Sequence, residues 1–492
     1  MVVKQITATP GNPFTHKTFA SESAMKKFLG IALLLALSMI GMGCGSTNSA
    51  SSSGGGSNAQ GSVFVTGEDA PASAVVGFNV TIDSLTLNNG STTVSAISSP
   101  EAVDFARLLG LRTLLGFNTI PAGTYNSITF TFENTNPAPV ISYVDLTTTP
   151  PSVQMLTGSF SQTTVTIPFP TGAPLVVDSN GLAGLRIDFD VHDSLATTNG
   201  QITGVINPVI NISAVSASSE VGQITDFTGN LVSVNTAGNS FLMQGPYGMP
   251  RTIDVNSSTQ YNGSNTLATL TTNAIVSVVG TMQADGSILA SMVEQVTTDQ
   301  AFVSGRVLAV NPSSGPVTSV TMWVGEELGT SAVYPVDTVQ TINLSGVSQY
   351  DICFFDNLLT DLVFNSSSLV VGQRIFVGGT VSGTTFTPNM VSLRRQGVWG
   401  ALVADSVNVT GGSGSNLGYY QMQNDALMSY AANGPFTVMT GNLTVFENID
   451  GLSGLAAAGT PNLVSRGLVF KNPTTGVPFV VAGRVRVLPP TE

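Results

Sequence analysis

The sequence predicts an all-β protein with an N-terminal sheet domain followed by about three copies of a smaller domain. Apolar and polar residues alternate with a period of two in many short segments, which is the pattern of half-buried strands. Segments that open with glycine recur in the C-terminal half and indicate an internal repeat. Charged residues make up only 9% of the chain, so Ser, Thr, Asn and Gly must supply the polar surface, as in strand-rich proteins.

The N-terminal domain shows strands and one interruption. Residues 62–65 and 78–87 alternate apolar and polar side chains, and Asn88-Asn89-Gly90 then provides a hairpin turn. The stretch from Val103 to Leu115 is amphipathic, which predicts one short helix or helical turn. Strands resume at Ser127 to Phe132.

Three short motifs in this region resemble a known bacterial family, domain of unknown function 4382. They are Val63-Phe64-Val65 leading into Glu68-Asp69-Ala70-Pro71, the turn Ile120-Pro121-Ala122-Gly123-Thr124-Tyr125, and Leu185-Arg186-Ile187-Asp188-Phe189-Asp190-Val191. The resemblance spans roughly residues 62 to 215. It implies a β-sandwich of undetermined activity.

The repeat is defined by its beginning and its end. Each predicted unit opens with glycine and a strand, and each closes with a strand that runs into glycine. The openings are Gly222–Phe227, Gly305–Val310 and Gly400–Asp405, and the closing strands are Val276–Gly280, Arg374–Gly379 and Phe479–Gly483. Glycine inside a strand suits the tight bend of a closed barrel. The alternative is two copies and an unrelated tail.

The first copy, with Asp285–Ala290 after its closing strand, resembles domain of unknown function 5666, which implies a small OB-type barrel. The predicted architecture is therefore an N-terminal β-sandwich followed by an array of about three small OB-like β-barrels. The expected boundaries are 62–218 for the sandwich and 219–299, 300–396 and 397–492 for the barrels.

The sequence predicts an export signal before these domains. Two lysines after Met25 lead into an uncharged apolar run that ends at Met42, which is shorter than the about 20 residues of a bilayer-spanning helix. Gly43-Cys44 then resembles the lipobox of bacterial lipoproteins, which implies acylation of Cys44. We expect residues 1–24 to be an over-extended start, 25–44 a lipoprotein signal peptide and 45–61 a flexible Ser/Gly tether. Ordinary secretion with a chance cysteine is the alternative.

Charge excludes one class of partner. The predicted leader holds four lysines and one acid, so the remainder has 16 − 4 = 12 positive and 29 − 1 = 28 negative residues, a net charge of 12 − 28 = −16. Such a chain repels phosphate backbones, so nucleic acid is not an expected partner. Once Cys44 is lipidated, Cys353 is the sole remaining thiol, and its apolar neighbours indicate a buried structural cysteine.

Few side chains after the leader are candidates for catalysis or metal binding, because His192 is the only histidine there. Asp188, Asp190 and His192 alternate with apolar residues and are expected to face together off one strand, with Asp178 nearby. Three interpretations stay open: a solvent-facing strand edge, a Ca²⁺ site, or paired carboxylates for acid/base work. Glu68 and Asp69 are further candidate ligand contacts, or ordinary turn residues.

The aromatic residues offer one more candidate contact. Tyr419-Tyr420 follows a Gly/Ser loop and could meet a ligand, although adjacent strand residues point to opposite faces and at most one of the two is expected to do so. Trp323 and Trp399 alternate with apolar residues, which favours core packing.

Two functions are consistent with this sequence. The first is a non-catalytic, lipid-anchored envelope protein, expected at the outer membrane because Gly45 follows the cysteine, whose body binds a glycan or an envelope protein or acts as a structural module. Ca²⁺ is the one candidate cofactor. The alternative is an envelope hydrolase acting on carbohydrate through Asp188 and Asp190.

Overall fold

The computed structural model describes residues 59–70, 74–198, 201–245, 250–353, 362–411 and 414–488. Residues 58–492 group into one compact unit. The predicted leader, Cys44 and nearly all of the tether lie outside the described residues. In the described part of the chain, no helix is long and apolar enough to cross a membrane.

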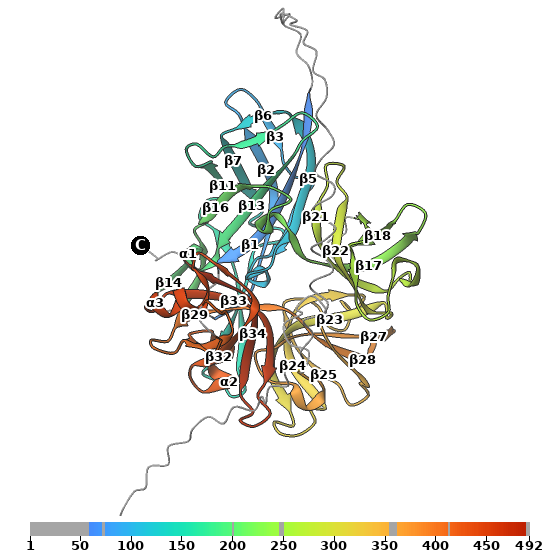
Figure 1. The fold of residues 1–492 in the computed structure, drawn as a ribbon, viewed down its shortest axis with the longest axis vertical. Coiled ribbons are helices and arrows are strands. Elements are labelled where there is room, and N and C mark those ends of the chain that lie inside the picture. Colours follow the sequence, from blue (N-terminus) through green and yellow to red (C-terminus); the bar gives the residue numbers. More distant parts are fainter. Residues whose placement is uncertain are drawn as a thin grey trace, which may run out of the picture. The chain divides into compact units, whose positions relative to one another are not determined.

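The N-terminal domain consists of two main sheets that share one hydrophobic core (Figure 1). One sheet has the order β16-β13-β1-β5, and the other has the order β11-β7-β2-β8-β9 with β3 and β4 on β2. Its elements are β1 Gln60–Ala70, β2 Val75–Asn88, β3 Thr93–Ser95, β4 Glu101–Asp104, η1 Ala106–Leu108, β5 Thr113–Pro121, β6 Gly123–Tyr125, β7 Ser127–Phe132, β8 Val140–Asp145, β9 Ser152–Thr157, β10 Ser159–Phe160, β11 Thr164–Pro168, β12 Leu175–Val177, β13 Leu182–Asp190, α1 Val191–Ser194, β14 Leu195–Thr198, β15 Gln201–Ile206 and β16 Ile210–Val215.

The core between these sheets follows the predicted alternation. Val63 and Val65 of β1 and Phe189 of β13 point inward from one sheet, and Phe78 and Phe130 do so from the other. The 3₁₀ turn η1 lies within the stretch predicted to be helical. The two sheets and the core that they share confirm the predicted N-terminal β-sandwich.

Three six-stranded sheets follow, one for each predicted barrel. The first contains β17 Ile224–Asn235, β18 Ser240–Gln244, β19 Pro250–Asp254, β20 Gln260–Tyr261, β21 Ile275–Met282 and β22 Ile288–Thr297, with η2 Glu220–Gly222 before it and η3 Leu267–Thr269 inside it. The second contains β23 Ala301–Asn311, β24 Ser319–Leu328, β25 Thr338–Asn343, β26 Gln349–Ile352, η4 Ser366–Ser368, β27 Arg374–Ser382 and β28 Thr385–Leu393. The third contains β29 Gln396–Leu402, β30 Asn408–Val409, β31 Gly418–Gln423, α2 Ala426–Ala432, β32 Phe436–Glu447, α3 Gly451–Ala457, β33 Asn462–Lys471 and β34 Pro478–Val487.

The three sheets share the same antiparallel strand pairs, and two of them close into a ring. In the first, β17, β18 and β19 form an antiparallel meander, β19 pairs with β22 in parallel, and β21 closes the ring by pairing with both β22 and β17. The third repeats this ring with β29, β31, β32, β34 and β33. The second has the same meander and antiparallel pairs, and its parallel pair is β26 with β28. The first and third sheets thus close into the five-stranded path of an OB-type barrel, as predicted, whereas the described strands of the second sheet have the open order β25-β24-β23-β27-β28-β26.

Glycines mark the same two places in every barrel, where strands approach too closely for a side chain. A Cβ on Gly229, Gly305 or Gly400 in the first strand would collide with the carbonyl of Gln244, Trp323 or Gln423 in the second. A Cβ on Gly280, Gly379 or Gly467 in the fourth strand would collide with a fifth-strand carbonyl in the same way. The tight bends of a small closed barrel account for these contacts.

These glycines correct the repeat register in two places. The opening glycine of the first barrel is Gly229, whereas Gly222 lies in the 3₁₀ turn η2 before the barrel. The closing glycine of the third barrel is Gly467 of β33, whereas Gly483 lies in β34, one strand later. A sequence repeat defined by glycine and apolar residues cannot separate neighbouring strands that carry the same pattern.

The glycine contacts can be tested by adding one methyl group. Gly400→Ala should destabilise the protein by about 1–3 kcal/mol, because the Cβ would meet the carbonyl of Gln423 rather than a movable side chain. Gly441→Ala in the same barrel is the control, since a Cβ there has nothing within 4 Å. Urea unfolding of both variants measures the difference, and equal midpoints would show that the close approach does not matter.

Candidate functional site

The arginines of this protein are concentrated at the contacts between domains. All eleven lie between residues 107 and 486, and at least eight of them have a nitrogen within 4 Å of a carboxylate oxygen of a described residue. Positive charges are rare in this chain, so the arginines that pair with carboxylates between domains leave few positive charges on the surface. The structure therefore places the main polar constellation inside the molecule.

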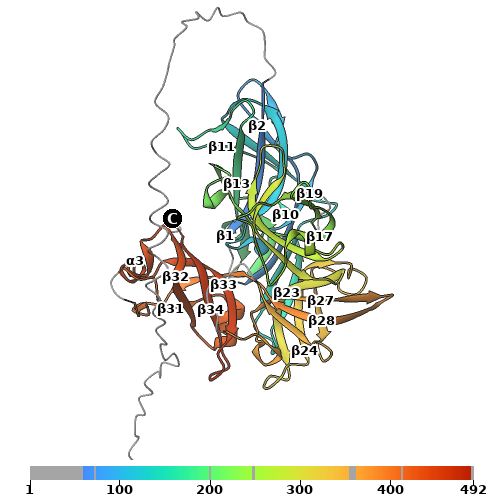
Figure 2. The same ribbon diagram turned by 45° about the vertical axis from the view of Figure 1, so that its right-hand side comes forward.

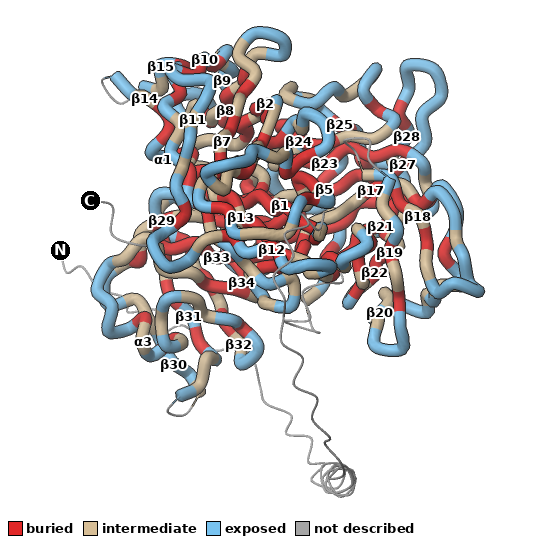
Figure 3. Tube along the Cα trace, turned by 90° about the horizontal axis from the view of Figure 1, so that it is seen from above, coloured by how far each residue is buried: buried red, intermediate tan, exposed pale blue. Residues whose placement is uncertain are grey.

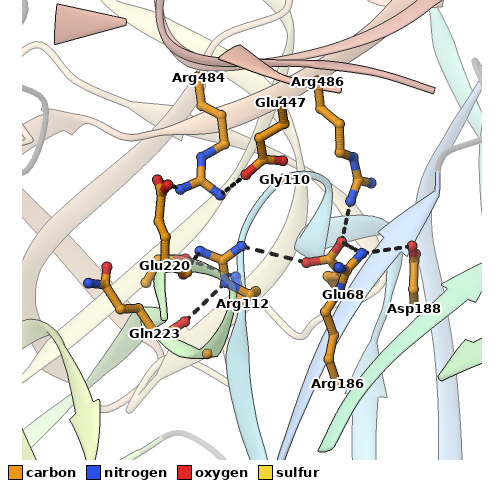
Figure 4. Close-up of polar contacts among 12 residues, drawn as sticks. Glu68, Gly110, Arg112, Arg186, Asp188, Glu220, Gln223, Glu447, Arg484 and Arg486 are labelled. Atoms are coloured by element: carbon orange, nitrogen blue, oxygen red, sulfur yellow. Dashed lines mark hydrogen bonds and ion pairs between the residues drawn. The ribbon is translucent and has the colours of Figure 1, made fainter. Parts of the chain in front are cut away.

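Glu68 lies at the centre of the first group, which we call the Glu68 cluster and define as Glu68, Arg112, Arg186, Asp188 and Arg486 (Figure 4). Its side chain is 3% exposed. Arg186 Nη2 lies 2.7 Å from Glu68 Oε1, Arg112 Nη1 lies 3.7 Å from Glu68 Oε2, and Arg486 of β34 also donates to Oε1. The cluster joins strand β1 of the sandwich to the last strand of the third barrel.

Electrostatics keep Glu68 ionised although it is buried. Burial by itself would raise the pKa of this carboxyl, but the guanidinium groups of Arg486, Arg186 and Arg112 together hold its pKa below the ordinary value. Arg112 also donates to the carbonyls of Gln223 at 3.0 Å and Glu220 at 2.7 Å, which fixes the segment leading into the first barrel.

Next to this cluster, Arg484 links that same segment to the third barrel. Its Nη1 lies 2.7 Å from Glu447 Oε1 within the barrel, and its Nη2 pairs with the carboxylate of Glu220. Burial and the neighbouring Arg112 lower the pKa of Arg484 to about 9. Positive charge is thus crowded here, and the carboxylates are needed to balance it.

A second group, the Asp226 cluster, consists of Asp226, Glu326, Arg107 and Arg374. Arg107 of the sandwich pairs with Asp226 of the first barrel and lies 3.0 Å from Glu326 of the second. Arg374 lies 2.6 Å from Glu326 and 3.7 Å from Asp226. Burial opposes ionisation of Asp226, but Arg374 and Arg107 lower its pKa. This cluster ties three domains together.

Two further arginines connect neighbouring barrels. Arg394 of the second barrel lies 2.9 Å from Glu294 of the first and donates to Ser277 Oγ at 2.9 Å. Arg306 of the second barrel lies 3.9 Å from Asp425 of the third. Ion pairs therefore occur at the contacts between consecutive barrels as well as at those with the sandwich.

An apolar cluster surrounds Trp323 beside these charges. The indole of Trp323 is 2% exposed and packs with Val144 of the sandwich, Leu308 of its own barrel and Leu427 of the third. It fits because Gly77 of β2 carries no side chain there, since a Cβ on Gly77 would collide with the ring. Trp323 thus packs in a core, as predicted, but this core is formed by three domains.

Two cavities lie at these junctions, and both are small. One of about 50 Å³ is lined by Asp69, Arg306, Trp323 and Trp399 among others. The other, of about 60 Å³, is lined by Glu101 and Arg251 among others. Sites for drug-sized ligands measure about 300–1,000 Å³. Each of these two cavities has room for a few water molecules.

The carboxylates predicted to form one site are separated by the structure. Asp188 lies in the Glu68 cluster with its side chain 14% exposed, whereas Asp178 lies in an exposed turn before β13, at the opposite end of that strand. Burial and the neighbouring Glu68 raise the pKa of Asp188 to about 6. Asp178 and Asp188 are therefore not brought together.

His192 does not continue the strand alternation, which corrects the prediction that it faces with Asp188 and Asp190. Strand β13 ends at Asp190, whose carboxylate accepts a hydrogen bond from the Asp193 backbone N–H at 2.9 Å and caps α1. An Asp side chain at position 190 can accept a hydrogen bond from the backbone N–H three residues later, and this spacing is the sequence signal for such a capped turn. Asp190, His192 and Asp193 instead bring candidate ligand atoms within 4.8 Å of one another. Three ligands are fewer than the six to eight that Ca²⁺ takes, so the Ca²⁺ site stays a prediction.

The remaining candidate ligand contacts differ in whether their side chains are buried or exposed. Asp69 is 1% exposed and lines the cavity beside Trp323, where burial and then Asp188 raise its pKa well above the ordinary value. Tyr420 is fully buried and bonds Ser465 Oγ at 2.6 Å, whereas Tyr419 is 37% exposed. The alternation predicted for this pair is what the structure shows. Cys353 is buried, as expected.

Comparison with known families gives matches for the N-terminal sandwich and for the first barrel. Residues 60–208 match the family described as Domain of unknown function (DUF4382), and residues 221–294 match the one described as Domain of unknown function (DUF5666). Both resemblances predicted from short motifs are confirmed, in the predicted order. No curated protein matches the chain. The protein is thus a multidomain β protein in which the sandwich is similar to the first of these families and the first barrel to the second.

The Glu68 cluster makes a prediction about stability. Arg486→Met should destabilise the protein by about 3–5 kcal/mol, because it leaves a buried carboxylate with less balancing charge. Lys471→Met, which removes a charge from a half-buried position in the same barrel, should change stability little. Urea unfolding at low and high salt measures both effects, and an Arg486→Met midpoint like that of the wild type would contradict a structural role for the cluster.

Asp104 predicts that stability depends on pH. Its carboxyl is buried and accepts from the Phe78 N–H at 2.8 Å, and burial, aided by Asp337 and opposed by Arg107, raises its pKa to about 7. The unfolded chain has the ordinary pKa of about 4. The folded state therefore keeps the proton that the unfolded state loses, and this contribution to stability falls as pH rises through about 7.

The melting temperature of Asp104→Asn should accordingly fall less between pH 5 and pH 8 than the melting temperature of the wild type does. Thermal unfolding at both pH values measures this, with Asp83→Asn, which changes an exposed carboxylate, as the control. Equal losses in wild type and Asp104→Asn would exclude Asp104 as the titrating group.

Proposed function

We propose that this protein is a non-catalytic cell-envelope protein, exported and attached through a lipid on Cys44, whose four β domains work as one binding, adhesion or structural module. The observation that carries the proposal is the burial of arginine–carboxylate pairs between the domains. A set of freely jointed domains would expose these charges to water. Because arginines and carboxylates from different domains balance one another's charge at several contacts, they favour one arrangement of the domains.

The same pairs argue against acid/base chemistry at the predicted acidic residues. Glu68 is balanced by three guanidinium groups, and Asp190 caps α1. Asp188 and Asp190 remain the basis of the alternative, an envelope hydrolase, because one oxygen of Asp188 has no hydrogen-bond partner and its pKa is raised. The two described cavities at the domain junctions have room for a few water molecules but not for a sugar chain, which supports the non-catalytic proposal.

The proposed location follows from the first 61 residues. A tether of Ser, Gly, Asn and Ala would let the rigid body extend from the outer membrane. A glycan or another envelope protein is the proposed partner. The low positive charge left on the surface is consistent with a partner that is not a nucleic acid.

The lipid anchor is tested by metabolic labelling. Cells grown with labelled palmitate should incorporate label into the wild-type chain and not into Cys44→Ala, because Cys353 is buried and cannot substitute. Cys353→Ala serves as the matched control and should label normally. Equal labelling of wild type and Cys44→Ala would refute the anchor.

A further inference from the structure

Three arginines lie side by side on the third barrel, on the face of β33 and β34 that points away from the barrel core. Arg466 is the cross-strand partner of Arg484, and Arg486 lies two residues further along β34 and points to the same side. Val485 between them packs inside the barrel. Like charges directly opposite each other in an antiparallel pair are destabilising. The barrel adds one carboxylate to this face, Glu447 opposite Arg486, so the face carries excess positive charge.

The sandwich covers this face. Strands β33 and β34 lie beside β1 in both Figure 2 and Figure 3, and β33 is buried over nearly all of its length. The sandwich contributes the carboxylate of Glu68 and the guanidinium of Arg112, and each of these side chains is 3% exposed. In Figure 4, Arg484 and Arg486 point from β34 toward Arg112 and Glu68. The contact thus brings the charges of both domains together away from bulk water.

A cavity of about 10 Å³ lies among these side chains. It is lined by the four arginines and two glutamates just named, and by Val464 of β33 among others. This volume is about the least that holds one particle of the size of water. An ion of several atoms, such as phosphate, does not fit.

The charge around this cavity is positive. The four arginines and two glutamates that line it sum to 4 − 2 = +2. Arg186 and Asp188 pair with each other beside Glu68 and cancel. Glu220 pairs with Arg484 from a position where its side chain is 47% exposed, and counting it in full leaves 2 − 1 = +1 among the described residues. One monovalent anion would balance this charge.

Two N–H groups of this cluster have no hydrogen-bond partner among the described residues. They are Nε of Arg484 and Nη2 of Arg486, and both atoms are shielded from solvent. The carboxylates contact other nitrogens of the same side chains, since Glu447 Oε1 lies 2.7 Å from Arg484 Nη1 and Glu68 accepts from Arg486 Nη1. A buried N–H of a charged group is costly without an acceptor. These two groups therefore suit an acceptor that carries negative charge.

We propose that this cavity binds one chloride ion, held by Arg112, Arg484 and Arg486. Chloride is a monatomic anion only slightly larger than water, and it accepts hydrogen bonds from several directions, so it suits guanidinium groups that converge from two domains. Water fits a similar volume but leaves the charge unbalanced. The ion acts as the counter-charge at the contact between the sandwich and the third barrel. This role depends neither on the lipid anchor nor on the partner of the proposed function.

Chloride should accordingly stabilise the folded protein. The full-length protein in detergent is unfolded by heat at constant ionic strength in sodium chloride and in sodium gluconate, whose anion is too large for the cavity. The melting temperature should be a few degrees higher in chloride and should rise with the logarithm of the chloride concentration, because the ion binds the folded state. Equal melting temperatures in the two salts would overturn the inference.

A carboxylate introduced at the cavity should replace the ion. Val464 lies opposite Arg486 across β33 and β34, and Val464→Asp adds a negative charge with little change in side-chain size. Val464→Asn is the matched control, because its amide has the same size and no charge. In gluconate, Val464→Asp should melt at the higher temperature of the two, and chloride should raise the melting temperature of Val464→Asn alone. An equal response of both variants to chloride would place the ion elsewhere and refute the site.

Bromide locates the ion directly and does not require either variant to fold. Crystals of the wild-type protein grown in sodium bromide should give an anomalous scattering peak between the guanidinium groups of Arg112, Arg484 and Arg486. A water molecule at this position, with bromide absent from it, would overturn the assignment whichever salt stabilises the protein.

Discussion

The arrangement of this protein depends on the pairing of buried arginines with buried carboxylates between its domains. A guanidinium or carboxylate taken out of water loses several kcal/mol of hydration, and only an opposite charge at hydrogen-bond distance restores it. Glu68 and Asp226 each face more than one arginine, so neither charge is left alone. A different packing of the domains would leave some of these groups buried without partners.

Such pairs select an arrangement more than they add to its stability. Well-packed apolar residues in their place could stabilise the fold equally, since the gain from a buried ion pair is largely offset by its desolvation. The apolar contacts of Trp323 with two other domains supply the hydrophobic contribution. The charges then determine which surfaces meet, because like charges or unpaired ones are costly in any other register.

The three barrels show how one fold acquires different roles through local substitutions. The glycines that allow close strand approach occur in all three, so the backbone path is the same. The second barrel directs Trp323 and Arg306 toward its neighbours, whereas the third presents Tyr419 and Leu443 to solvent. Packing and exposure thus differ among units whose antiparallel strand pairs are equivalent.

The sequence by itself determined the β class, the sandwich and the repetition of a smaller β unit, because strand alternation and turn glycines are local patterns. It also predicted that Tyr419 and Tyr420 face opposite ways, since alternate orientation is a property of a single strand. Only the tertiary structure decided that Glu68 belongs with Arg486, which is 418 residues away, because no local pattern encodes a contact between distant strands. For the same reason the separation of Asp178 from Asp188 and the register of Gly467 appeared only when the strands were paired.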